Sequence, residues 1–302
     1  MEKTKIELNK FVERWLGSVS SSGNSERTYK AAIRNLFTYF NEYGIESPTK
    51  EDLEIWRAKL VAEGKTESTI QLYVVTCRSF FGWLASENLY PDISNKLKGA
   101  KVTVTNKRDA LTARQAKDLL KSVKGNDEKA LRDRAILALL VSCGLRTIEI
   151  VRADVEDLRG GFLRVQGKGH SEKDSLVRVP EQVEKLIRLY LAKRQARKVE
   201  PLFTSTSNRS KNMRLSTCSI RKFVKVCLRS IGLDDERLSA HSLRHTCATL
   251  ALLEGASIAQ VQQVLRHQDL NGIKIYEHTD GMLEPDRFEN PVENIIADLL
   301  MK

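Results

Sequence analysis

The chain has 302 residues, about twice the usual domain size, which predicts two domains that each bury a core of their own. Its formal net charge of +11 favours a polyanionic partner, most commonly nucleic acid, although a charge that only aids solubility stays open. Five scattered cysteines lack metal-ligand spacing, and no apolar run suits a signal peptide or a transmembrane helix, so we expect a cytoplasmic protein without membrane or disulfides.

The first part of the chain has the apolar spacing of amphipathic helices. Thr49, followed by Asp52 three residues later, predicts the N-cap of one helix, and Thr66 predicts the start of the next. We therefore expect residues 1–97 to form a small helical bundle. Each of its first two helices should face the core with one apolar stripe. The first stripe consists of Leu8, Phe11, Val12, Trp15 and Leu16, and the second of Ile33, Leu36, Phe37 and Phe40.

A lysine-rich segment without helical periodicity, residues 98–109, predicts an exposed linker to a second domain, residues 110–302. Thr112 and Gln115 form a capping-box pair at the start of a helix in that domain. The stretches 162–166 and 175–179 have strand-like patterns around a glycine-rich turn, which predicts a β-hairpin. The expected fold class is therefore mainly α, with a small β-sheet in the second domain.

The end of the chain carries a further apolar stripe. Pro285 and Pro291 indicate an extended connection, and a short helix is expected at about residues 291–302. So short a helix must bury its apolar face, either on its own domain or on a neighbouring protomer. The residues of this stripe are Val292, Ile295, Ile296, Leu299 and Leu300.

Several residues with chemical potential each have an ordinary alternative reading. Arg146 is spaced for a salt bridge with Glu149 on the next helical turn. Lys168, between two glycines, suits a solvated hairpin tip, and His241 suits a helix cap or a core position. Tyr276, beside an isoleucine, suits packing. Taken singly, none of these residues identifies a site.

Taken together, these residues suit catalysis at a phosphodiester. Arg146 and Arg244 supply two planar forks that can hold phosphate oxygens and offset the charge of the transition state. Histidine and lysine side chains can transfer the protons of the attacking and leaving oxygens, and a tyrosine can attack. The candidates for these roles are Lys168, His241, His267 and Tyr276.

A tyrosine nucleophile needs no cofactor and no metal, because the phosphotyrosyl ester keeps the energy of the broken bond. The sequence contains neither a Walker GxxxxGK[ST] motif nor an acidic cluster spaced for two metal ions. These absences weigh against an ATPase and a two-metal nuclease.

Four stretches resemble the boxes of the tyrosine recombinase, or phage integrase, family. GLRTIEI is similar to its first arginine box, HSLRHTCATL to its HxLRH box, and QGKGH lies where its hairpin lysine is found. LRHQDLNGIKIYEH is similar to the box in which a histidine precedes the nucleophilic tyrosine by nine residues. The resemblance covers nearly the whole chain, with the helical first part similar to the family's core-binding domain.

The resemblance implies a site-specific recombinase that cleaves and rejoins duplex DNA through a 3′-phosphotyrosyl link and a Holliday junction. Arg146 and Arg244 would bind the scissile phosphate, Lys168 would protonate the leaving 5′ oxygen, and Tyr276 would attack. His241 and His267 would assist. The implied partners are double-stranded DNA, held in a clamp of two domains, and three further copies of the chain. The involvement of accessory DNA-bending proteins is left open.

Some residues depart from the family pattern. Arg266 stands where the family commonly has glycine, and Gly272 and Ile273 replace small hydroxyl residues that are common in its Xer members. The hairpin turn is longer than in Xer proteins, which makes Lys173 a second candidate for the general acid. These departures favour a recombinase of a mobile element, by integration or excision, over multimer resolution.

Two other functions stay open. A type IB topoisomerase uses similar residues to nick and reseal one duplex, but it works as a monomer, whereas recombination needs an assembly on two sites. A non-catalytic architectural DNA-binding protein would have no reason to carry the full set of candidate residues together.

Overall fold

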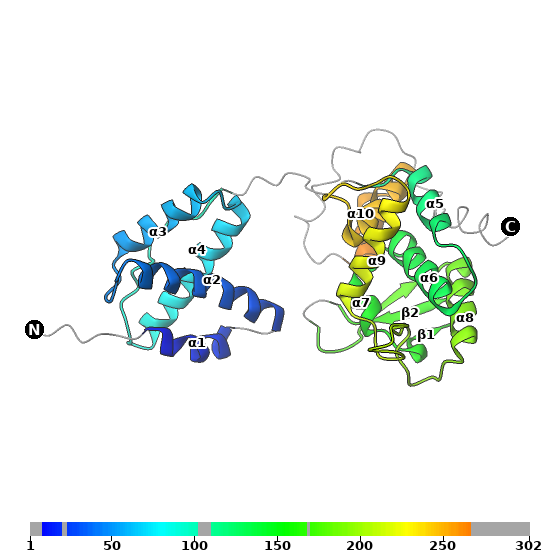
Figure 1. The fold of residues 1–302 in the computed structure, drawn as a ribbon, viewed down its shortest axis with the longest axis horizontal. Helices are drawn as coiled ribbons and strands as arrows, with labels where there is room; N and C mark the ends of the chain where they lie inside the picture. The colour runs from blue at the N-terminus through cyan, green and yellow to red at the C-terminus, as the bar shows by residue number, and fades with distance from the viewer. Residues whose placement is uncertain (1–7, 20–22, 102–109, 168–169, 267–302) are drawn as a thin grey trace, which may run out of the picture. The chain divides into compact units, whose positions relative to one another are not determined.

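The computed structural model describes residues 8–19, 23–101, 110–167 and 170–266 (Figure 1). The chain separates into two compact units, Met1–Thr105 and Asn106–Lys302, each with its own core. Among the described residues, no helix is long and apolar enough to span a membrane.

The first unit is entirely helical in its described part. A short 3₁₀ turn leads into four α-helices, which form the expected bundle. These elements are η1 (Leu8–Phe11), α1 (Val12–Val19), α2 (Gly23–Glu42), α3 (Lys50–Ala62) and α4 (Glu67–Ser86).

The core of this unit is rich in aromatic side chains. Trp15 of α1 is fully buried and meets Phe80 of α4 edge to face, with ring centroids 5.4 Å apart. The indole of Trp56 donates a hydrogen bond of 2.9 Å to the Asn35 side chain, so its polar edge is satisfied. The stripes predicted from the sequence supply this core, because their buried or half-buried members include Leu8, Leu16, Ile33, Leu36 and Phe40.

The helix starts predicted at Thr49 and Thr66 are confirmed. The Thr49 backbone donates to the Asp52 carboxylate at 2.7 Å, and the Asp52 backbone donates to the Thr49 hydroxyl at 3.3 Å. Thr66 accepts from the backbone of Thr69 in the same way. Both caps satisfy donors that the first helical turn would leave without a partner.

Thr49→Ala is expected to lower the free energy of unfolding by about 1 kcal/mol, because α3 loses the hydroxyl that accepts from Asp52. Urea unfolding followed by circular dichroism measures this change. Thr49→Ser keeps the hydroxyl and serves as the control. Equal stability of the alanine variant and the wild type would show that the cap contributes nothing.

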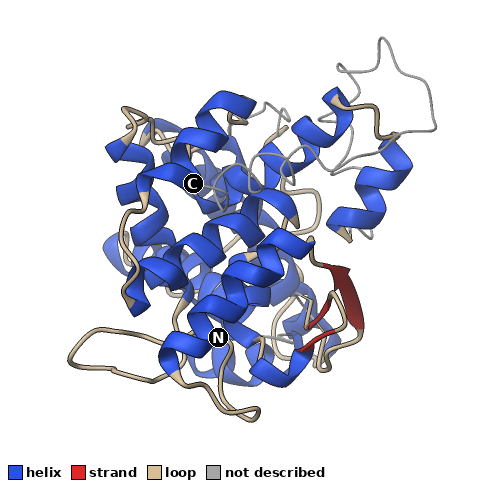
Figure 2. Ribbon diagram, turned by 90° about the vertical axis from the view of Figure 1, so that its right-hand side faces the viewer, coloured by secondary structure: helices blue, strands red, loops and turns tan. Residues whose placement is uncertain are grey.

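The second unit is mainly helical, with one small sheet, in agreement with the expected fold class (Figure 2). Its elements are α5 (Ala113–Ser122), α6 (Glu128–Ser142), α7 (Thr147–Arg152), η2 (Val155–Asp157), β1 (Leu158–Arg159), β2 (Phe162–Val165), β3 (Ser175–Arg178), α8 (Glu181–Arg194), α9 (Thr217–Ser230), α10 (Ala240–Leu253) and α11 (Ile258–Leu265). The capping box predicted at Thr112 and Gln115 is present at the start of α5.

The predicted hairpin is confirmed as β2 and β3, which pair antiparallel with Leu163 opposite Val177 and Val165 opposite Ser175. The two-residue β1 adds a third strand at the other edge of β2. Leu163, Val165 and Val177 are buried, whereas Phe162 and Leu176 point to the exposed face. One face of the sheet thus packs on the core, and the other face is exposed to solvent.

Helix α6 runs through the middle of the second unit, with α8 and α10 packed against it (Figure 1). Nearly all its residues from Ala130 to Ser142 are buried, the pattern of a helix surrounded by protein. The chain that leaves its C-terminal end, beginning at Cys143, leads directly into the candidate site.

Candidate active site

Arg146 lies at the start of α7, where one carboxylate fixes both its backbone and its side chain. The Arg146 Nη1 donates to Glu149 Oε1 at 2.8 Å, and the Arg146 backbone nitrogen donates to Glu149 Oε2 at 2.8 Å. The salt bridge that the spacing predicted is therefore present. The Arg146 side chain keeps 28% of its surface exposed while Glu149 is buried, so its guanidinium remains accessible to a ligand.

Arg244 of α10 is almost fully buried beneath this helix start. Its guanidinium donates to the backbone oxygens of Gly144 and Leu265, which lie on two separate segments of the unit. Burial, and secondarily the positive charge of Arg146, lowers the pKa of Arg244 to about 9. Arg244 therefore stays protonated at neutral pH and ties together the segments that carry Arg146 and Arg266.

Gly144 is required where these segments meet. Its φ of +55° is in the left-handed region, and a Cβ there would lie 2.6 Å from the Leu265 side chain. The carbonyl of this glycine accepts a hydrogen bond from Arg244. The glycine of the GLRTIEI stretch thus has a packing reason.

His241 lies in the first turn of α10, three residues before Arg244, so the two share one side of the helix. His241 is exposed, in contrast to Arg244. Its ring meets that of His245 edge to face, with centroids 5.0 Å apart. An exposed imidazole one helical turn before Arg244 is suited to proton transfer at a bound phosphate.

Arg266 joins the site, although sequence reasoning noted it only as a departure from the family pattern. Its Nη2 donates to Glu149 Oε2 at 2.9 Å, and its Nη1 donates to the Val264 carbonyl at 2.7 Å. The Arg266 side chain is 15% exposed. Glu149 thus accepts from two arginines that lie far apart in the sequence.

Burial alone would raise the pKa of the Glu149 carboxyl. The charge of Arg266 and the hydrogen bonds and charge of Arg146 outweigh burial and hold this pKa below its ordinary value. Glu149 is therefore ionised at neutral pH, as its role between two guanidinium groups requires.

Glu149→Gln is expected to lower the free energy of unfolding at neutral pH by about 1–3 kcal/mol, because Arg146 and Arg266 lose their shared anion. A depressed carboxyl pKa stabilises the fold above the unfolded pKa and stops doing so as pH falls through the folded pKa. The stability difference between wild type and variant should therefore shrink below about pH 4.5. Urea unfolding at several pH values measures it, and a pH-independent difference would contradict this origin.

The ends of the hairpin turn are held by hydrogen bonds. Arg152 Nη1 donates to the Gly167 carbonyl at 3.1 Å, and the Gln166 side chain donates to the carbonyls of His170 and Ser171. The turn therefore leaves β2 beside α7, the helix that begins at the candidate phosphate-binding Arg146.

The Lys173 ammonium contacts the carboxylates of Asp154 and Asp157. Burial alone would lower its pKa, but these two bonds outweigh burial and raise the pKa of Lys173. A lysine held between two carboxylates is a weak proton donor, so these contacts weigh against Lys173 as a general acid. Lys168, His267 and Tyr276 lie outside the described residues, as does the helix expected at about residues 291–302.

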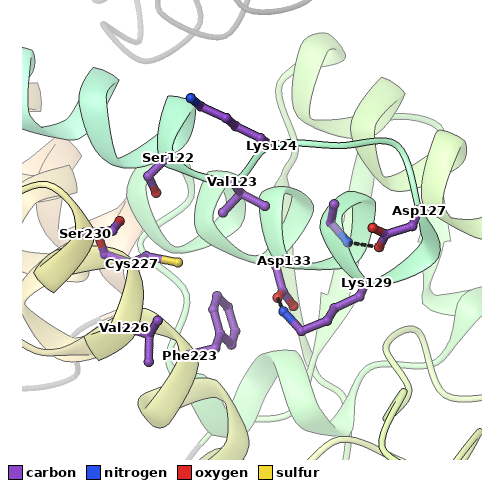
Figure 3. Close-up of a pocket in the computed structure, with 11 residues that line it drawn as sticks. Ser122, Val123, Lys124, Asp127, Lys129, Asp133, Phe223, Val226, Cys227 and Ser230 are labelled. Carbon is purple, nitrogen blue, oxygen red and sulfur yellow. Dashed lines mark hydrogen bonds and ion pairs between the residues drawn. The ribbon is translucent and has the colours of Figure 1, made fainter.

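A separate cavity of about 300 Å³ lies between α5, α6 and α9 (Figure 3). Its walls include Phe223, Cys227 and the ion pair of Lys129 with Asp133. None of its lining residues is Arg146, Glu149, Arg244 or Arg266. Within the described part of the chain, no group of histidine, cysteine or acidic side chains is placed to hold a metal ion.

The chain resembles known proteins over most of its length. The model of the phage integrase family matches residues 109–281, and that of the phage integrase N-terminal SAM-like domain matches residues 8–88. The tyrosine recombinase XerC of Thermodesulfovibrio yellowstonii is 31% identical over 85% of this chain and 87% of its own length. The tyrosine recombinase XerD of Proteus mirabilis is 30% identical over 88% of each chain.

A solved structure has the same fold. A lambda integrase tetramer bound to a Holliday junction superposes with a TM-score of 0.71 at 18% identity, covering 95% of this chain and 81% of the lambda integrase chain. The family resemblance seen in the sequence is confirmed, and the chain belongs to the phage integrase family of tyrosine recombinases.

Proposed function

We propose that this protein is a site-specific recombinase that cleaves and rejoins duplex DNA through a covalent 3′-phosphotyrosyl intermediate and a Holliday junction. The observation that carries the proposal is the cluster of Arg146 and Arg244 around the buried Glu149, in a chain of this family. An anion-binding site of arginines is what a phosphodiester requires. The net charge of +11 suits a DNA partner.

In this reaction Arg146 and Arg244 hold the non-bridging oxygens of the scissile phosphate and stabilise the charge that builds up on them. Tyr276 attacks the phosphorus, and the bond to the 5′ oxygen breaks. Lys168 donates the proton that this oxygen takes up, while His241 and His267 assist the phosphate contacts and proton transfers. Attack by the released 5′ hydroxyl of another strand reverses the step, so no cofactor or metal is needed.

The organisation of the chain follows from this function. Residues 1–97 form a core-binding domain, 98–109 a linker and 110–302 the catalytic domain. Four copies act on two DNA sites, and a tetramer of lambda integrase bound to a Holliday junction supports this arrangement. The protein works in the cytoplasm, where the DNA of a mobile element or a multimeric chromosome is accessible.

Covalent trapping tests this function and locates its DNA sites. The protein is incubated with genomic fragments, denatured, and recovered with any DNA still attached, which is then sequenced. Two copies of a recovered site on one plasmid should recombine when the protein is added. Relaxation of supercoils without exchange between the sites would instead identify a topoisomerase, and binding without any covalent product an architectural protein.

Lys168→Ala is expected to slow cleavage of an ordinary substrate by about 10²–10⁴-fold, because the leaving 5′ oxygen loses its proton donor. A 5′-thio substrate, whose leaving sulfur needs little protonation, should restore most of the rate. Cleavage assays on both substrates, with Lys173→Ala as the control, measure this rescue. Equal defects on oxygen and sulfur, or rescue of the Lys173 variant instead, would contradict the role of Lys168.

A further inference from the structure

Arg146, Arg244 and Arg266 form an arginine cluster around the Glu149 carboxylate. Their three positive charges exceed the single negative charge that this carboxylate offers. Arg146 and Arg266 both donate to Glu149, and the positive charges of both lower the pKa of the neighbouring Arg244. Three guanidinium groups therefore surround a single buried carboxylate. Uncompensated charge in a partly buried site is costly unless an anion binds there.

Arg266 adopts a backbone conformation that its residue type disfavours. It forms the C-cap of α11 with φ of +51° and ψ of +48°, in the left-handed region where glycine is the usual residue. An arginine there accepts a conformational cost that glycine would avoid. The interactions of the Arg266 side chain offset this cost.

One of these interactions is with the opposite oxygen of the carboxylate that holds the Arg146 side chain. Glu149 Oε1 accepts from Arg146 Nη1 at 2.8 Å. Glu149 Oε2 accepts from the Arg146 backbone nitrogen at 2.8 Å and, as a second donor, from Arg266 Nη2 at 2.9 Å. Bonds to both oxygens fix the plane of the carboxylate, and this plane sets the direction of the Arg146 fork. Among the described residues, the Arg266 Nε has no hydrogen-bond partner.

Arg266 also lies next to the support of the second arginine. The residue before it, Leu265, offers its backbone oxygen to Arg244. One short segment thus contacts Arg244 through its backbone and Arg146 through the Arg266 side chain and Glu149. The conformation of the segment formed by Leu265 and Arg266 therefore affects the positions of both Arg146 and Arg244.

We propose that Arg266 is a positioning residue of the catalytic centre, which acts through Glu149 to orient Arg146 and adds a third positive charge beside the scissile phosphodiester. The inference rests on the proposed function and deepens it. As a positioning residue, Arg266 acts on the reaction through Glu149 and through its charge. Its effect belongs to the rate of cleavage rather than to the binding of DNA, most of which comes from contacts along the duplex.

The test compares Arg266→Gly with the wild type on a nicked duplex that traps the covalent adduct. Glycine suits the left-handed backbone, so the substitution removes the side chain without adding strain. The single-turnover rate of adduct formation should fall about 10–100-fold, while half-site affinity changes by less than about threefold. Arg266→Lys, which keeps the charge, should recover part of the rate.

Two control variants separate this role from general effects. Gln195 caps α8 with φ of +56°, so Gln195→Gly repeats the backbone change at an exposed position. Arg188→Gln removes an exposed arginine that is paired with Glu184. Both should form adduct at the wild-type rate, and circular dichroism verifies that every variant is folded at the assay temperature.

A double-variant cycle tests the route through Glu149. If Arg266 acts through this carboxylate, adding Arg266→Gly to Glu149→Gln should slow the reaction little further. Multiplying defects, a wild-type rate for Arg266→Gly, or an equal loss of rate and affinity would each overturn the inference. If Glu149→Gln does not fold, the inference is tested by the rates at position 266 alone. The wild type should then be fastest, Arg266→Lys intermediate and Arg266→Gly slowest, and any other order would overturn the inference. Failure of the wild type itself to form an adduct would instead refute the proposed function.

Discussion

Tyr276→Phe is expected to abolish the covalent protein–DNA adduct while leaving DNA affinity within about twofold. The substitution removes only the attacking oxygen, and loss of a nucleophile costs at least about 10³-fold in rate. Arg146 and Arg244, which we assign to phosphate binding, are unchanged. Denaturing gels of a nicked, labelled duplex measure the adduct, and gel shifts measure affinity.

Tyr43→Phe is the matched control, because Tyr43 is 61% exposed in the first unit and its ring is kept. It should form adduct at the wild-type rate. A denaturant-resistant adduct of Tyr276→Phe would show that another residue attacks. Loss of affinity together with the adduct would show that the tyrosine contributes to binding instead.

Local signals made the helix starts predictable from the sequence. The caps at Thr49, Thr66 and Thr112 each depend on residues no more than three positions apart, so their pattern is complete within one turn. The hairpin was predictable for the same reason, because alternation and a glycine-rich turn are local. The two-residue β1 is too short to form a pattern of its own.

Contacts between distant residues were not predictable from local pattern. Arg132 and Asp133 form a buried ion pair in α6, with Arg132 also donating to the Thr204 carbonyl at 2.9 Å. Charged residues are usually exposed on a helix, so the sequence of α6 does not indicate that this pair is buried. The pair is buried because a loop more than seventy residues away contacts it. The sequence of α6 contains no pattern that indicates this contact.

The candidate site divides in the same way. Arg146 and Glu149 are one turn apart, so their contact was expected from spacing. The convergence of Arg146 with Arg244 was inferred from the chemistry of phosphate binding and from the family resemblance rather than from spacing, because Arg244 reaches Gly144 across one hundred residues. The contact of Arg266 with Glu149 was missed, since a departure from a family pattern does not indicate which partner replaces the lost feature.

Arg244→Lys is expected to slow adduct formation by about 10²–10³-fold although the positive charge is kept. The Arg244 guanidinium spans two backbone oxygens on separate segments, those of Gly144 and Leu265. Its planar fork does this while other N–H groups remain for a phosphate, whereas the three donors of lysine all leave a single atom. Single-turnover assays with the trapping duplex measure the rate, and Arg188→Lys, at an exposed position, is the control.

The defect of Arg244→Lys should also grow as pH rises. Burial and the charge of Arg146 lower the pKa of the native arginine to about 9, which leaves it protonated at neutral pH. The same surroundings act on a lysine whose ordinary pKa is only about 10.4, and therefore bring its pKa towards neutrality. A cation is lost as pH rises through its pKa, so the ratio of wild-type to variant rate should increase between about pH 6 and pH 8. A ratio constant over that range would mean that the lysine stays charged, and that the geometry of the fork alone accounts for the loss.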